Sequence, residues 1–101
     1  MLIKLMTVRT TDPDAFHQAQ LAWNQLRDVP GFLGQCGGWS RAEAGVAHLV
    51  ACWSDRAGYD AFMAGPHDRI FGGQSRTYDS LEVHLVDAEP AWTVRPDGRA
   101  A

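Results

Sequence analysis

The sequence predicts an α+β domain whose strands and helices follow one another in the order β-α-β-β-α-β. Three observations lead to this order. Apolar residues alternate with polar ones or run continuously in four short segments, they recur at helical spacing in two others, and turn-forming residues separate the six segments. This is the order of a ferredoxin-like fold, in which a four-stranded antiparallel sheet carries both helices on one face.

The first half of the chain supplies one strand and one helix. Residues 2–9 are rich in apolar and β-favouring types and predict the first strand. The first helix begins where Asp12 can accept hydrogen bonds from free amides and Pro13 suits the first helical position. The helix ends at residues 28–31, because proline disfavours helical geometry in the residue before it. Its apolar stripe comprises Phe16, Ala19, Trp23 and Leu26.

The second half supplies three strands and one helix. Residues 32–40 and 46–53 predict a hairpin, because only a short polar loop separates them. Ser54 or Asp55 caps the second helix, and a Gly-Pro pair ends it. The last strand covers about residues 77–87, where apolar and polar side chains alternate.

The composition is that of one globular domain with a small negative charge. Since 46% of the 101 residues are hydrophobic, intrinsic disorder is not expected for most of the chain. The net charge of −3, without any Lys/Arg cluster, argues against a nucleic-acid partner. No apolar run reaches the roughly 20 residues that span a bilayer, and the N-terminus lacks signal-peptide features. We therefore expect a cytoplasmic protein without a membrane partner.

The expected domain covers residues 1–88, and the expected tail covers residues 89–101. The tail is rich in proline and is expected to be partly disordered or to dock on a partner subunit, with Trp92 as its one large ring. A sheet face without helices would expose an apolar patch of a size that is rare on monomers. We therefore expect two copies of the sheet to pair face to face in a two-fold homodimer.

Residues 30–39 (PGFLGQCGGW) combine a strand position with four glycines. Glycine weakens a strand unless a bulge or a close approach requires it, so this segment predicts the wall of a cavity. Gln35 and Trp39 are four residues apart and share one face of the strand, whereas Cys36 lies on the other face. A bulge at the glycine pair before Trp39 would reverse this assignment.

The chain resembles the dimeric α+β-barrel superfamily in three passages. These are the glycine-rich segment, the pattern W-x5-Y-x2-FM from Trp53, and the pattern FM-x3-HD-x-IF from Phe62 with Gln74 and Tyr78 after it. Within the superfamily it is most similar to the antibiotic-biosynthesis-monooxygenase-like domains, in a poorly characterised bacterial branch. The resemblance covers roughly residues 1–87. It implies a small hydrophobic ligand between the sheet and the two helices of each subunit.

The resemblance directs attention to polar residues near that cavity. It favours His67 as a general base or acid, since an imidazole takes up and releases protons near neutral pH. Asp68 would orient His67 through a hydrogen bond, and Tyr78 would donate one to a substrate oxygen. Gln35 and Gln74 would meet the ligand as inward-facing amides. The remaining candidate ligand-binding residues are Trp23, Trp39, Cys36 and Phe62.

Each of these assignments has a purely structural alternative. His67 and Asp68 follow a helix break, where a histidine or a carboxylate commonly caps a helix end. Tryptophans at helical spacing, such as Trp23, are commonly part of a core. We expect no metal centre, because the four histidines are scattered without the spacing of a ligand set.

The resulting hypothesis is a small enzyme that acts on a hydrophobic, aromatic or polyketide-like molecule. The resemblance implies oxygenation without a bound cofactor, with His67 as the base and Gln35, Tyr78 and Trp39 holding the substrate anion. The same residues would serve a cyclase, a dehydratase or an isomerase. Two further alternatives are an enzyme that binds haem or a metal ion through His67 and a non-catalytic module that binds a metabolite.

Overall fold

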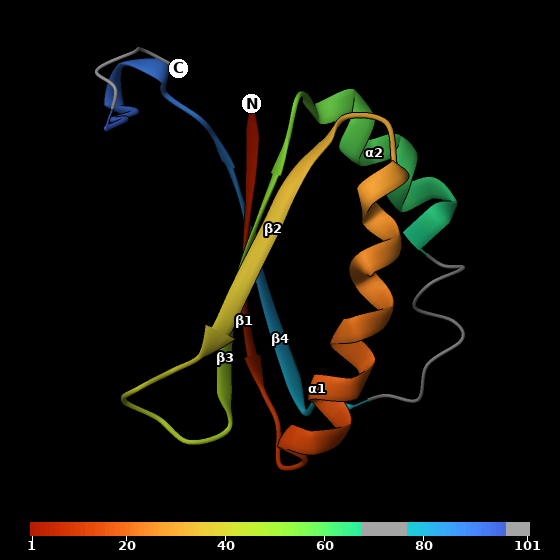
Figure 1. Ribbon diagram of the computed structural model, residues 1–101, viewed down its shortest axis with the longest axis vertical. Helices are drawn as coiled ribbons and strands as arrows, with labels where there is room; N and C mark the ends of the chain where they lie inside the picture. The colour runs from red at the N-terminus through yellow and green to blue at the C-terminus, as the bar shows by residue number, and fades with distance from the viewer. Residues whose placement is uncertain (68–76, 97–101) are drawn as a thin grey trace.

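The structure is a computed structural model that describes residues 1–67 and 77–96. It confirms the predicted element order and the ferredoxin-like α+β fold (Figure 1). The strands are β1 (Leu2–Arg9), β2 (Phe32–Trp39), β3 (Val46–Trp53) and β4 (Ser80–Asp87). The helices are α1 (Pro13–Leu21) and α2 (Arg56–Ala64), with the short 3₁₀ helices η1 (Ala22–Asp28) and η2 (Pro90–Trp92).

The strands form one antiparallel sheet in the order β2-β3-β1-β4. β1 is central and pairs along its whole length with both β3 and β4. Figure 1 shows α1 and α2 on the same side of this sheet. The register sets the alternating residues Leu81, Val83 and Leu85 of β4 on the helix side, opposite Val8, Met6 and Lys4 of β1.

The first helix differs from the single helix that the apolar stripe predicts. It is α-helical only to Leu21 and continues as a 3₁₀ helix from Ala22 to Asp28. In a 3₁₀ helix, residues three apart lie directly above one another, so Trp23 and Leu26 both turn toward the sheet. The chain leaves helical geometry at Val29, as the following proline predicts.

The second helix, α2, begins after one of the two predicted N-cap residues. Asp55, and not Ser54, is the N-cap, because its Oδ1 accepts a hydrogen bond from the backbone N–H of Gly58 at 2.8 Å. Because Tyr59 and Phe62 are three residues apart on α2, both enter the core from the same side of the helix.

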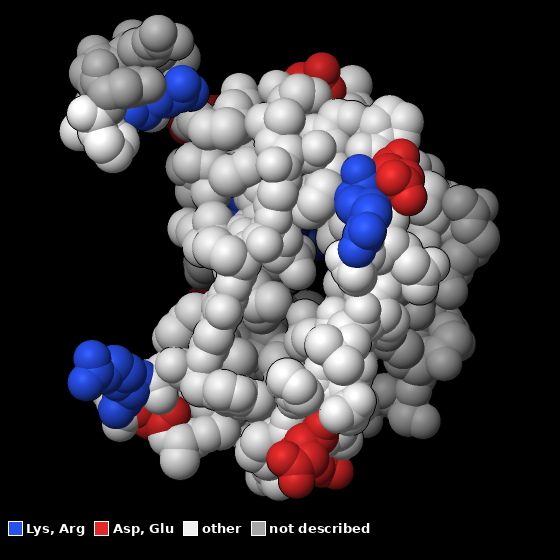
Figure 2. Space-filling model, in the orientation of Figure 1, with Lys and Arg blue, Asp and Glu red and all other residues white. Residues whose placement is uncertain are grey.

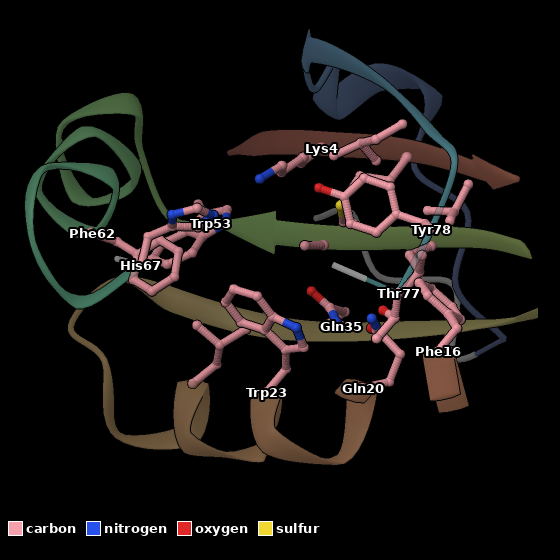
Figure 3. Close-up of a pocket in the computed structure, with 16 residues that line it drawn as sticks. Lys4, Phe16, Gln20, Trp23, Gln35, Trp53, Phe62, His67, Thr77 and Tyr78 are labelled. Carbon is pink, nitrogen blue, oxygen red and sulfur yellow. The ribbon is translucent and has the colours of Figure 1, made fainter. Parts of the chain in front are cut away.

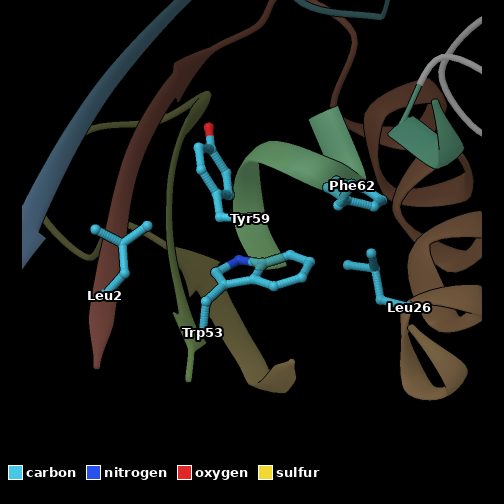
Figure 4. Close-up of a cluster of buried hydrophobic side chains, with 5 residues drawn as sticks. All are labelled: Leu2, Leu26, Trp53, Tyr59 and Phe62. Atoms are coloured by element: carbon cyan, nitrogen blue, oxygen red, sulfur yellow. The ribbon is translucent and has the colours of Figure 1, made fainter. Parts of the chain in front are cut away.

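An aromatic cluster fills one end of the space between the sheet and the helices (Figure 4). Its centre is Trp53, the last residue of β3, which is only 2% exposed. The Trp53 ring lies 5.3 Å from Phe32, 5.7 Å from Tyr59 and 5.2 Å from Phe62, measured between centroids. Leu2 and Leu26 complete the buried set, so this cluster joins β1, β3, α2 and η1.

The fourth strand begins later than predicted, at Ser80 instead of residue 77. Thr77 and Tyr78 precede it without strand geometry. At this point a side-chain hydrogen bond to Thr10 holds the chain in place of strand pairing. The buried Thr10 hydroxyl donates a hydrogen bond to the Thr77 carbonyl at 2.8 Å, and strand pairing then starts beyond Asp79. This anchor places Tyr78 beside the helix side of the sheet.

The opposite face of the sheet carries no helix in the described residues. It turns Leu5, Val50 and Val86 outward, each with between 36% and 41% of its surface exposed. The homodimer stays a prediction, as do the domain boundary at residue 88 and a docking role for the tail. Trp92 lies in η2 and is 84% exposed in the single chain.

Charged side chains lie singly or in opposite pairs on the face of the molecule that Figure 2 shows, and they are mostly at its periphery. The centre of that face is largely uncharged and is hollowed. No helix among residues 1–67 and 77–96 is long and apolar enough to cross a membrane.

Candidate functional site

A pocket lies between the helix side of the sheet and the helices α1, η1 and α2 (Figure 3). It leaves about 100 Å³ for the centres of water-sized molecules, whereas about 10–15 Å³ of such space holds one water. The space is therefore hollow and large enough for a small organic ligand. Most of its walls are apolar, and they include Met6, Val8, Leu49, Ala51, Leu81 and Leu26.

One wall of the pocket is formed by three rings. The His67 ring lies 5.5 Å from Trp23 and 5.7 Å from Phe62, and these two rings are 6.5 Å apart, measured between centroids. The chain is helical again at Pro66 and His67, just after α2 ends. The His67 imidazole is partly buried and lines the pocket. The predicted residues Trp23, Phe62 and His67 are thus brought together.

Polar side chains enter the pocket from different elements. Gln35 comes from β2, Gln20 from α1, and Tyr78 from the segment that precedes β4. Figure 3 shows Gln35 and Tyr78 directing their polar ends toward the middle of the pocket. The predicted Gln35 and Tyr78 therefore line the pocket, whereas Gln20 was not anticipated, because it appears only as a polar residue beside the apolar stripe of the first helix.

Trp39 and Cys36 lie apart from this pocket. Gln35 and Trp39 do share the helix side of the sheet, as predicted, because the register shift in β2 falls before Gly34. However, the Trp39 ring packs against Phe16, with centroids 5.7 Å apart, and lines a second hollow beside the first. Cys36 is exposed and also borders that second hollow.

The glycine pair before Trp39 has two different surroundings. A Cβ atom on Gly37 would lie 2.6 Å from the His48 carbonyl oxygen and 2.9 Å from Leu49 Cγ, so this glycine permits a close approach of β3. A Cβ on Gly38 would meet no atom within 4 Å. Close strand packing thus accounts for Gly37, whereas the backbone of β3 leaves room for a side chain at Gly38.

Lys4 also lines the pocket and was missed as a site residue. Its Nζ lies 5.0 Å from the centroid of the Tyr59 ring, a distance typical of a cation–π contact. Burial lowers the pKa of Lys4 from its usual value, because the charged amine loses part of its hydration. The signal in the sequence was its place in β1, where it is the one charged residue at the inward positions 2, 4, 6 and 8.

Two predicted residues, Asp68 and Gln74, lie outside the described residues. Among residues 1–67 and 77–96, no three His, Cys, Asp or Glu side chains converge in a way that could hold a metal ion. The polar side chains that the described residues bring to the pocket are those of His67, Tyr78, Gln35, Gln20, Thr77 and Lys4.

Comparison with known proteins assigns the chain to a family. Residues 2–86 match the family model described as a domain of unknown function, DUF4937. The chain belongs to the DUF4937 family. It is 33% identical, over 116 aligned positions, to the uncharacterised protein YdbC of Bacillus subtilis (strain 168), and the alignment covers 93% of this chain and 98% of YdbC.

Solved structures show the same fold as this DUF4937 member. A candidate antibiotic biosynthesis monooxygenase of Deinococcus radiodurans gives a TM-score of 0.74 at 17% identity, over 94% of this chain and 99% of that chain. A point mutant of SnoaB, a cofactor-independent oxygenase of Streptomyces nogalater, gives 0.63 at 15% identity, over 94% and 96%. The haem degrader MhuD of Mycobacterium tuberculosis, solved with two haems, gives 0.67 at 14% identity, over 87% and 95%. These neighbours confirm the predicted monooxygenase-like fold.

Proposed function

We propose that the pocket binds a small aromatic molecule and that the protein oxygenates this molecule without a bound cofactor. The observation that carries the proposal is an apolar pocket into which an imidazole, a phenol and an amide project. Apolar pockets with a few convergent polar groups are the usual form of small-molecule sites. The fold shared with a cofactor-independent oxygenase supports the reaction class.

The proposed reaction begins with the removal of a proton from a phenol-type substrate. The His67 imidazole accepts this proton, and hydrogen bonds donated by Tyr78 and by the Gln35 amide stabilise the anion. The electron-rich carbon of the anion then forms a bond to dioxygen. When the O–O bond breaks, one oxygen atom stays on that carbon as a carbonyl, and the other leaves as water with the hydrogen of that carbon and the proton that His67 had accepted. The substrate supplies the electrons that reduce oxygen.

Oxygen consumption with anthrone- or naphthol-type phenols tests this proposal. We expect the protein to accelerate oxygen uptake above the spontaneous oxidation of the same phenol in the same buffer. With an anthrone, one oxygen molecule should be consumed for each quinone formed, and isotopically heavy oxygen should label the new carbonyl. A heat-unfolded sample is the matched control. Uptake no faster than in that control would reject the oxygenase, and a Soret band in the purified protein would favour a haem enzyme instead.

A further inference from the structure

The pocket contains one cation that the proposed reaction does not use. Lys4, the only lysine of the chain, projects from β1 toward the helices and lines the pocket (Figure 3). Its strand neighbours are apolar, with Ala51 opposite it on β3 and Leu85 opposite it on β4. A charged amine in such surroundings is destabilised by lost hydration unless another group compensates for it.

No anionic group in the described structure compensates for this charge. Lys4 has neither an ion pair nor a hydrogen bond with residues 1–67 or 77–96, and its recorded contact is the face of the Tyr59 ring. None of the described residues that line the pocket is acidic. The nearest carboxylate on the same face of β4, Asp87, lies two residues beyond Leu85. Burial lowers the pKa of Lys4, and no carboxylate among the residues that the structure describes offsets this effect.

The titratable side chains that face Lys4 from the described residues include no carboxylate. Tyr59 on α2 has a pKa raised mainly by burial, so its hydroxyl stays uncharged around neutral pH. Tyr78 and His67 face the same pocket from its other sides. A neutral ring attracts a cation but cannot balance its charge. The pocket is therefore complementary to an anion.

We infer that the ligand of this pocket carries an anionic oxygen, a carboxylate or a phenolate, which pairs with the Lys4 ammonium. This inference rests on the proposed function, because it requires that the pocket binds a small aromatic molecule. The apolar walls would hold the ring, and Lys4 would select ligands by their charge. In the proposed oxygenation, the same ammonium would stabilise the anion that forms when the phenol loses its proton.

The pH dependence of binding follows from this pairing. An anion beside Lys4 favours its charged form and so raises the pKa of Lys4 above the value in the free protein. The complex therefore takes up a proton when it forms at a pH above the free-state pKa of Lys4. Affinity for the anion should be highest below that pKa and should fall as the pH rises through it.

Naphthoate and its neutral amide, naphthamide, are probes of the same shape that differ in charge. By isothermal titration calorimetry, we expect the protein to bind naphthoate at least about tenfold more tightly than naphthamide. Lys4→Gln should abolish this preference while leaving naphthamide affinity within about a factor of three. Arg41→Gln is the matched control, since it removes the same charge from an exposed loop position and should leave the preference intact.

A second measurement needs no substitution. Reductive methylation with labelled formaldehyde places labelled methyl groups on Lys4, which is the only lysine of the chain. The NMR shift of these methyl groups, followed as a function of pH, reports the pKa of Lys4. We expect naphthoate, but not naphthamide, to raise that pKa. Equal affinity of the wild-type protein for both probes, or a preference that survives Lys4→Gln, would overturn the inference about Lys4 alone. If neither probe binds the wild-type protein, both the proposed pocket function and this inference fail.

Discussion

Trp53→Ala is expected to lower the free energy of unfolding by about 3–5 kcal/mol, the range for truncating a large buried aromatic ring. Trp53 is the largest fully buried side chain, and its ring contacts Phe32, Tyr59 and Phe62 from two different elements, β2 and α2. The partners are fixed to the sheet and to α2, so they can only partly collapse into the space that is left. Chemical denaturation followed by circular dichroism measures the change.

Trp92→Ala is the matched control for this substitution, because it removes the same side chain from a position that is 84% exposed. It should change the free energy of unfolding by no more than about 0.5 kcal/mol. If Trp53→Ala were as mild as Trp92→Ala, the aromatic cluster would not be the centre of the core. If Trp92→Ala were the more damaging of the two, the tail would have to be packed against protein in solution.

His67→Ala is expected to reduce the rate of oxygen uptake by about 10²–10⁴-fold, the usual contribution of a general base. In the proposed reaction, no other described side chain of the pocket takes the phenol proton. His67→Gln is the informative companion, since it keeps a polar side chain between Trp23 and Phe62 but cannot be protonated. Both variants should lose the rise in rate with pH that accompanies deprotonation of a base.

His84→Ala is the control for these variants. His84 lies on the opposite face of the sheet and pairs with Glu82 at 3.1 Å, away from the pocket. Its removal should leave the rate of oxygen uptake within about a factor of two. A full rate in His67→Gln, measured on protein whose circular dichroism matches the wild type, would show that His67 only packs against its neighbouring rings.

Most of the fold was predictable because alternation and helical spacing are local properties of the sequence. β1 and β3 have the predicted bounds, and residue 55 caps α2 as one of two neighbouring candidates. The two differences arise from contacts over a long range in the chain. Thr77 is held by the distant Thr10, and Trp23 of η1 packs against Phe62 and His67, which lie about 40 residues later in the chain.

The candidate site was predictable only in part. His67 and Tyr78 were selected through a family resemblance and Gln35 first through the glycine-rich strand, and the structure brings all three to one pocket. Trp39 was placed on the correct face of β2, but the ring of Phe16 on α1 packs against it beside a second hollow. Lys4 was passed over, although it is the one charged residue at positions 2, 4, 6 and 8, because both faces of β1 carry apolar residues and the register with β3 decides which face points inward.

The central claim is that a small aromatic molecule enters the pocket between the sheet and the helices. The indole N–H signals of the four tryptophans provide built-in NMR probes, since Trp23 and Trp53 line the pocket and Trp92 is exposed in the tail. On addition of naphthol, we predict that the signals of Trp23 and Trp53 shift with a common saturation curve while that of Trp92 stays in place. Unchanged signals from Trp23 and Trp53 up to the solubility limit of naphthol would contradict the claim.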